Sequence, residues 1–155
     1  MSKEMDLSEL SDFLKDRASG IYSNLEKAIE GCCIKVRDDI KFSMAHTPRD
    51  MTRSYFTNNK TKAHHPSLPH NPPAPDSGNL RENTIQYEIH NEGRNVYGVV
   101  GSTQKDPDYA TWTEYGTTKM IERPWLRPAM RKNNDFIRMQ VARAVKETLT
   151  GGNNQ

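Results

Sequence analysis

One apolar stripe of helical spacing constrains the fold of this chain more than any other feature of its sequence. Its members recur every three or four residues: Leu7, Leu10, Leu14, Ala18, Ile21, Leu25, Ala28, Cys32, Val36, Ile40 and Met44. The spacing predicts an amphipathic helix over residues 7–44, about 55 Å long and capped by Ser8 or Ser11. A helix of this length with a single stripe usually packs along a whole sheet or on another chain.

The supply of core-forming residues is small for a chain of 155 residues. Only 34% of them are apolar, and the mean hydropathy is −0.91. We therefore expect that part of the chain is disordered or that other chains complete its order. No apolar run approaches the roughly 20 residues that span a bilayer, so we expect no membrane span. The polar N-terminus predicts no signal peptide, and the adjacent Cys32 and Cys33 predict no disulfide, which favours synthesis in the cytoplasm.

Residues 46–75 lose the helical pattern and contain six prolines. They predict an extended, irregular Pro/His-rich insertion loop. Its histidines match no metal-ligand spacing, so we expect no metal site. The aromatic pair Tyr55 and Phe56, together with His64 and His65, are candidate contacts to a partner protein.

The remaining chain predicts a small α+β core over residues 76–150, followed by a polar tail over 151–155. Alternation predicts strands at 84–90 and 96–101, joined as an antiparallel hairpin with Ile85, Tyr87 and Ile89 on one face. Residues 109–115 suit a strand or a short helix. A C-terminal helix opens at Pro124 and stops before Gly151. With a long helix over residues 1–45, the fold class is α+β in a single domain.

Charge and motif searches favour a structural role over catalysis. Residues 123–155 hold seven basic and two acidic side chains, a net charge of +5. The candidates for weak contact with DNA or a partner are Arg131, Lys132, Arg138 and Arg143. No dinucleotide loop, P-loop or Gly-x-Ser-x-Gly elbow occurs, so we expect neither an enzyme nor a cofactor. We expect Glu114 to pair with an arginine, with Arg81, Arg123 and Arg127 as the alternatives.

Three segments in order carry a family resemblance. They are Ala74-Pro75-Asp76-Ser77-Gly78-Asn79-Leu80-Arg81, then Tyr109-Ala110-Thr111-Trp112-Thr113-Glu114-Tyr115-Gly116-Thr117, then Arg123-Pro124-Trp125-Leu126-Arg127-Pro128-Ala129. Over residues 74–147, with the long helix before them, the chain resembles the tail-completion (neck) proteins of long-tailed bacteriophages, the minor tail protein Z-like family. The matching motif positions are Asp76, Gly78, Leu80, Arg81, Tyr109, Glu114, Gly116, Arg123, Pro124, Trp125 and Arg127. Ser77, Trp112, Thr113 and Trp125 depart mildly from the family pattern, and the 46–75 insertion departs more strongly.

The resemblance implies a structural protein of the virion neck, assembled as a homo-oligomeric ring around the DNA channel. Six copies, which would match the tail, are favoured over twelve, which would match the portal. The implied partners are the head connector or adaptor ring, the tail terminator or tail tube protein, and passing DNA bound without sequence preference. We also expect the Asp76–Arg81 turn and the Glu114–Arg127 region to hold the sheet to the C-terminal helix. Two alternatives are a tail terminator that caps the tube and a non-specific nucleic-acid-binding module.

Overall fold

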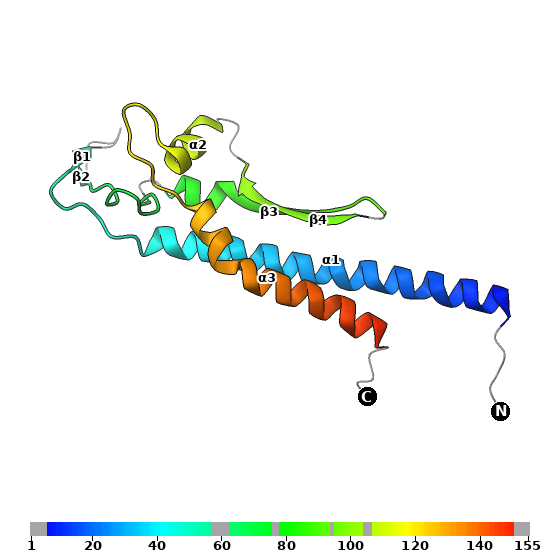
Figure 1. The fold of residues 1–155 in the computed structure, drawn as a ribbon. Helices are drawn as coiled ribbons and strands as arrows, with labels where there is room; N and C mark the ends of the chain where they lie inside the picture. Colours follow the sequence, from blue (N-terminus) through cyan, green and yellow to red (C-terminus); the bar gives the residue numbers. More distant parts are fainter. Residues whose placement is uncertain (1–5, 57–62, 76–77, 94, 104–106, 151–155) are drawn as a thin grey trace. The chain divides into compact units, whose positions relative to one another are not determined.

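The chain folds as an α+β protein, in agreement with the sequence prediction (Figure 1). The structure is a computed structural model, and it describes residues 6–56, 63–75, 78–93, 95–103 and 107–150. Its elements, in order, are α1 (Leu7–Ala45), β1 (Tyr55–Phe56), β2 (Ala63–His64), the π-helical turn η1 (Leu80–Thr84), β3 (Ile85–Asn91), β4 (Val96–Ser102), α2 (Pro107–Tyr115) and α3 (Leu126–Leu149).

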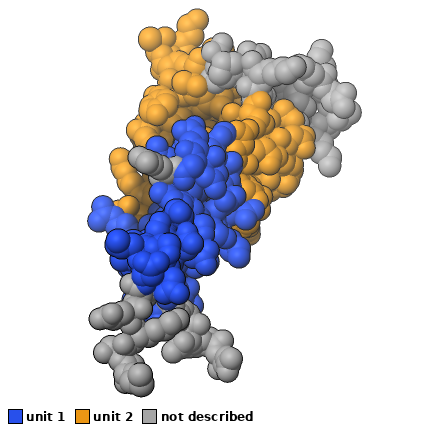
Figure 2. Space-filling view, turned by 90° about the vertical axis from the view of Figure 1, so that its right-hand side faces the viewer, with its two compact units in different colours: residues 1–32, 89–98, 135–155 blue, residues 33–88, 99–134 orange. Residues whose placement is uncertain are grey.

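The chain divides into two compact units, which Figure 2 distinguishes by colour. Unit 1 comprises residues 1–32, 89–98 and 135–155, and unit 2 comprises residues 33–88 and 99–134. Helices α1 and α3 and the β3–β4 pair each contribute residues to both units.

Helix α1 matches the predicted helix to within one residue, and its cap is the part that differs. The Asp6 carboxylate accepts hydrogen bonds from the backbone N–H of Leu7 at 2.7 Å and from the hydroxyl of Ser8 at 2.8 Å. Asp6 therefore caps the helix, and the predictions of Ser8 and Ser11 were wrong. Asp6 directly precedes the first helical residue, where a side-chain acceptor reaches the free N–H groups.

Unit 2 contains most of the buried apolar side chains among the described residues. Val36, Ile40 and Met44 of α1 are at most 1% exposed, and Ile85 is fully buried. Cys33, Ala74, Ala110, Trp125 and Ala129 complete this core. The predicted stripe is thus a true core face in the second half of α1, because unit 2 covers it.

Unit 1 has far less buried apolar surface. Its almost fully buried apolar side chains, among the described residues, are the small Cys32 and Ala144. Polar contacts join α1 to the last turn of α3 in this unit. Arg17 Nη1 donates to the carbonyl of Thr148 at 2.6 Å, and Asn24 Nδ2 donates to the Thr148 hydroxyl at 2.8 Å.

The predicted insertion loop contains a short antiparallel pair, which the sequence analysis had not anticipated. Strand β1 pairs with β2 in the register Tyr55↔His64 and Phe56↔Ala63. An isolated bridge between Arg49 and Ser67 continues the pairing toward α1. The segment therefore folds back on itself, even though its prolines and polar residues gave no strand pattern.

The β3–β4 hairpin forms where alternation predicted it. The turn closes with a hydrogen bond from the Glu92 N–H to the Asn95 carbonyl at 2.9 Å. Ile85 is buried and Tyr87 half-buried, while Gln86 between them and Glu88 after Tyr87 are exposed. The guanidinium carbon of Arg37, from α1, lies over the Tyr87 ring, 5.1 Å from the ring centroid. The predicted inward face of β3 is therefore confirmed at these positions.

Helices α2 and α3 show which prediction for residues 109–115 was right and where the C-terminal helix begins. Residues 107–115 form a helix, α2, and not a strand. Helix α3 begins at Leu126, two residues after Pro124, so Pro124 is not its first residue as predicted. The turn before α3 is fixed by contacts with α2, which also supply its cap.

Candidate functional site

The second and third motif segments meet at the N-terminus of α3. The carboxylate of Glu114, from α2, accepts three successive backbone N–H groups there. Oε2 accepts from Trp125 at 2.7 Å and from Leu126 at 2.9 Å, and Oε1 accepts from Arg127 at 2.9 Å. These are donors that a helix leaves without intrahelical partners, and a negative charge at this end is favoured by the helix dipole. Glu114 is therefore a helix cap supplied from another helix.

The arginine partner of Glu114 is Arg127, one of the three that the sequence allowed. Arg127 Nε donates to Glu114 Oε1 at 2.9 Å, and Nη2 donates to the Glu114 backbone carbonyl at 2.6 Å. The same Nη2 reaches Glu122 Oε2 at 2.8 Å, and the guanidinium lies 4.9 Å from the Tyr115 ring centroid. Arg127 thus ties the end of α2, the connection and the start of α3 together.

This arrangement corrects the expected role of the Glu114–Arg127 region, whereas the start of the Asp76–Arg81 turn lies outside the described residues. We expected the Asp76–Arg81 turn and the Glu114–Arg127 pair to hold the sheet to the C-terminal helix. The contacts of Glu114 instead join α2 to α3. Arg81 Nε donates to its neighbour Glu82 at 2.6 Å, so Arg81 is engaged within η1.

Trp125 closes the junction from inside. Its side chain is 3% exposed, and its indole N–H lies 3.2 Å from the Thr113 hydroxyl, which is itself buried. The backbone N–H of Arg123 donates to the Thr113 carbonyl at 2.6 Å. The indole has its polar partner inside the core, as a buried tryptophan requires.

Gly116 makes the return from α2 possible. Its φ is +76°, a conformation that side-chain-bearing residues rarely adopt. A Cβ atom there would lie 2.9 Å from both the Met120 carbonyl oxygen and the Glu122 nitrogen. The motif glycine is therefore required both by its backbone angle and by the close approach of the chain.

Two ionisable groups of the junction are shifted toward their charged forms. The hydrogen bond from Arg127, with a smaller contribution from His70, holds the pKa of the Glu122 carboxyl below its usual value. The hydrogen bonds to Glu122 and Glu114 raise the pKa of Arg127. Since both Glu114 oxygens accept two donors each, the carboxylate serves as a cap and is not free to act as a general base.

The first motif segment is described only in part. Asp76 lies outside the described residues. Gly78 has φ +80°, and its carbonyl accepts the Glu82 N–H at 2.8 Å, which fits the predicted tight turn. Leu80 and Arg81 open η1, and both are half-buried.

The candidate partner contacts divide between described and undescribed side chains. The backbones of Tyr55 and Phe56 form β1, but their side chains lie outside the described part of the structure. His64 is only 7% exposed, so it does not present a free surface. The ring of the half-buried His65 makes a 2.8 Å hydrogen bond with the Arg53 carbonyl.

Two of the four basic candidates on α3 have acidic partners. Arg143 pairs with Glu147 at 2.6 Å, and Lys132 lies 3.6 Å from Asp39 of α1. Arg131 and Arg138 are exposed, and they make no ion pair within the described part of the chain. Glu147 is already counted in the net +5 of the segment, so it is the pairing of Lys132 with Asp39, outside the segment, that lowers the free positive charge further.

Sequence reasoning missed a polar link between α1 and α3 in unit 2. Asn133 is 3% exposed and donates to Asp39 Oδ2 at 2.9 Å, where Lys35 also donates at 2.7 Å. Burial raises the pKa of Asp39, but these hydrogen bonds and the charges of Lys35 and Lys132 outweigh it, so the net pKa is lowered. The signal in the sequence was Asn133 itself, a polar residue at a position where the helical spacing of α3 calls for a core residue.

Neither a metal cluster nor a membrane span is found among the residues that the structure describes. In the parts of the chain that the structure describes, no group of three or more His, Cys, Asp or Glu side chains is placed to hold a metal ion. Within the same parts, no helix combines the length and the apolar character needed to cross a bilayer.

Comparison with known proteins finds no similar protein. No family model, no curated protein and no solved structure matches the chain.

Proposed function

We propose that this chain is a structural protein of the bacteriophage head–tail joint, a tail-completion or neck protein that forms a homo-oligomeric ring around the DNA channel. The family resemblance of the three motif segments suggests this role. The observation that carries the proposal is the incomplete core of unit 1, because a ring subunit can leave apolar surface for its neighbours to cover.

The uncovered apolar surface lies on the first turns of α1. Leu7 is 82% exposed, Phe13 is 46% exposed and Leu14 is 58% exposed. Together with Leu10 and Ala18 they belong to the first turns of α1, on either side of Arg17, whose guanidinium reaches the last turn of α3. Contiguous exposed apolar surface of this kind is typical of protein–protein contact.

The capped α2–α3 junction supports a scaffold role. Its buried Glu114 carboxylate accepts from the Trp125 backbone and from the half-exposed Arg127, and the buried Trp125 indole donates to the Thr113 hydroxyl. A rigid junction of this kind suits a subunit that must hold its shape while neighbouring rings bind it. The proposal includes no enzymatic activity.

The deciding experiment is deletion of the reading frame from the phage genome that encodes it. We expect DNA-filled heads and separate tails of normal length in electron micrographs, and recovery of joined virions when the wild-type chain is supplied in trans. Overlong tails would instead favour the tail terminator, since an uncapped tube continues to polymerise. Joined, infectious virions without the chain would refute both proposals.

A matched pair of variants tests the surface that carries the proposal. Leu10→Glu with Leu14→Glu should abolish rescue and ring formation, because it places charge on the apolar face. Phe42→Glu changes a still more exposed residue of the same helix, 62% exposed in unit 2 against 40% for Leu10 and 58% for Leu14, and should rescue. Equal rescue by both variants would show that the first turns of α1 make no essential contact.

The nucleic-acid-binding alternative is tested by salt dependence. With Arg131 and Arg138 as the exposed arginines of α3 that have no ion partner among the described residues, about two phosphate contacts from this helix predict a slope of log K against log salt near −2. A much steeper slope, or preference for a DNA sequence, would favour a dedicated DNA-binding module over the neck protein.

A further inference from the structure

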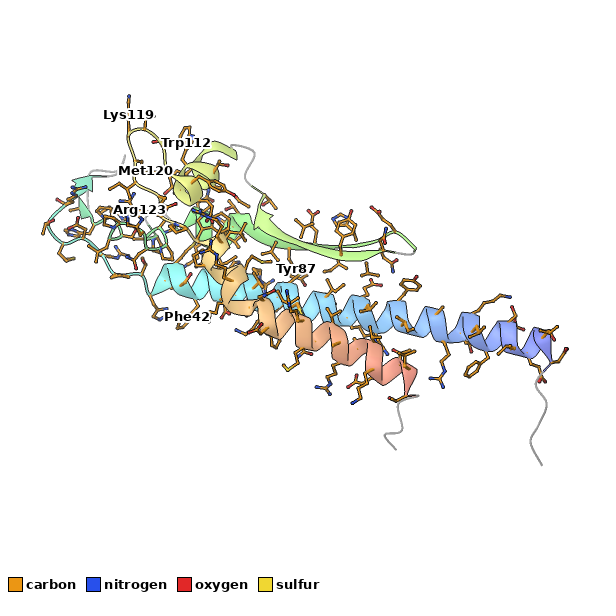
Figure 3. All side chains as sticks on the ribbon, in the orientation of Figure 1. Phe42, Tyr87, Trp112, Lys119, Met120 and Arg123 are labelled. Atoms are coloured by element: carbon orange, nitrogen blue, oxygen red, sulfur yellow. The ribbon has the colours of Figure 1, made fainter. Side chains whose placement is uncertain are left out.

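A pocket of about 280 Å³ in unit 2 is lined by two residues with buried polar groups that have no hydrogen-bond partner among the described residues. Its walls come from three stretches of chain, which are the end of β2 with the residues after it, the segment before η1, and α2 with the connection to α3. The lining residues are His64, Pro66, Ser67, Pro73, Ala74, Tyr109, Thr113, Met120 and Arg123. Figure 3 labels Met120 and Arg123, both of which line the pocket, on that connection, with Lys119 near its tip.

The two polar groups are the hydroxyl of Ser67 and the Nε–H of Arg123. Ser67 is 1% exposed, and its Oγ has no hydrogen-bond partner among the described residues. Arg123 Nε is also buried, and none of the residues that the structure describes accepts from it. A buried donor without an acceptor is costly, so such groups in a folded protein call for an explanation.

The guanidinium of Arg123 is oriented in a way that favours a planar anion. Nε and Nη2 form one edge of the group, and Nη2 makes only a long contact of 3.5 Å, to the Ser67 carbonyl. Within the described residues no carboxylate pairs with Arg123, whereas Arg127 four residues later has two. The edge that binds carboxylates through two parallel hydrogen bonds thus has no carboxylate among the described residues, and it lies next to a hydroxyl donor that also has no acceptor there.

The largely apolar walls of the pocket restrict the kind of molecule to which the bound anionic group can belong. Pro73, Ala74 and Met120 are apolar, and the ring of Tyr109 adds a further largely apolar surface. One guanidinium supplies one positive charge, which matches a single carboxylate better than a doubly charged phosphate. The apolar walls would contact a hydrocarbon stem behind the carboxylate.

We propose that this pocket binds a carboxylate on an apolar stem, held by Arg123 and Ser67. The carboxylate can belong to an acidic side chain of a partner protein or to a free organic acid, because both present the same two oxygens. This inference does not rest on the proposed neck function, since it concerns one chain and its own pocket.

The test is a titration of the purified full-length chain followed by NMR of arginine Nε–H signals. The probes are sodium butyrate and butyramide at constant ionic strength, and two capped tripeptides that carry a central glutamate or glutamine. We expect a saturable shift of the Arg123 signal with butyrate and with the glutamate peptide, and none with the two amides. Tighter binding of the peptide identifies a protein partner, and equal or tighter binding of butyrate identifies a free acid.

Variants separate the pocket from general charge attraction. Ser67→Ala should weaken binding severalfold while the Arg123 signal still shifts, and Arg123→Gln should weaken it at least about tenfold. Arg131→Gln, which removes an exposed arginine of α3, should leave binding unchanged. The titration of the wild-type chain keeps the test valid if Arg123→Gln does not fold.

Three results would overturn the proposal. One is an equal shift of Arg123 with the amides, which would mean that no carboxylate is recognised. Another is an equal loss of affinity in Arg131→Gln, which would mean that any surface arginine suffices. The third is binding that appears only after Asp76→Asn, a residue two positions after Ala74 in the sequence, because the chain's own carboxylate would then be the occupant.

Discussion

Replacing Glu114 with glutamine is the sharpest test of the α2–α3 junction. The substitution keeps the size of the side chain and removes its charge. One carboxylate oxygen becomes an NH₂ group, which is a donor. Whichever oxygen is replaced, two N–H groups lose their acceptor, either those of Trp125 and Leu126 or the backbone and Nε groups of Arg127.

The expected cost follows from the burial of the carboxylate. Glu114 is 3% exposed, so water cannot replace the lost acceptor without opening the junction. An unsatisfied buried donor costs about 1–3 kcal/mol, and loss of a helix cap costs about 1 kcal/mol. We therefore expect the free energy of unfolding to fall by about 2–4 kcal/mol. With a urea dependence of about 2 kcal/mol per molar, the midpoint should fall by about 1–2 M.

The assay uses the fluorescence of Trp125, which is buried at the junction. Trp112→Phe removes the only other tryptophan, which is 47% exposed, and serves as the background for all variants. Glu122→Gln is the matched control, because Glu122 contacts the same arginine but is half-exposed and caps no helix. A Glu114→Gln midpoint within 0.3 M of the background (about 0.6 kcal/mol), or no lower than that of Glu122→Gln, would refute the capping role.

Three further perturbations test the fold. Gly116→Ala should lower the free energy of unfolding by about 1–3 kcal/mol, since its Cβ would lie 2.9 Å from backbone atoms at positive φ, while Gly101→Ala has open space and should change thermal unfolding little. Ile40→Ala should cost about 2–5 kcal/mol in urea unfolding because the side chain is fully buried, and equal loss in Met139→Ala, which is 59% exposed, would contradict the assigned core. The lowered pKa of Asp39 means that its stabilising contribution is complete above its unfolded pKa of about 3.8 and is lost as pH falls through the folded value below it. The free energy of unfolding, measured between pH 6 and pH 2, should therefore fall less steeply with pH in Asp39→Asn than in the wild type. An unchanged pH dependence would show that Asp39 does not contribute to it.

The local elements were predictable because their signals are local. The three- to four-residue spacing from Leu7 to Met44 defines one helix face, and α1 follows it to within one residue. Alternation around Ile85 and Tyr87 predicted β3, and the turn between the strands fixed their pairing. The helix cap was missed because Asp6, Ser8 and Ser11 all have suitable side chains, and only the backbone geometry selects one of them.

The candidate site was predictable in its residues but not in its contacts. The motif pattern singled out Glu114, Gly116, Trp125 and Arg127, and it required an arginine partner for the glutamate. It did not determine which arginine, nor that the carboxylate would cap α3. That choice depends on how the chain turns at Gly116 and brings residues 13 positions apart into contact.

The sequence by itself determined the α+β class, the long helix, the hairpin and the set of motif residues, because periodicity and turn chemistry act over a few residues. Only the tertiary structure decided which face of α1 is covered in each unit, that Asn133 binds Asp39, and that Ser67 and Arg123 share a pocket. These contacts join positions 94 and 56 residues apart, respectively. At such separations the partners are selected by the packing of whole elements, which no local pattern encodes.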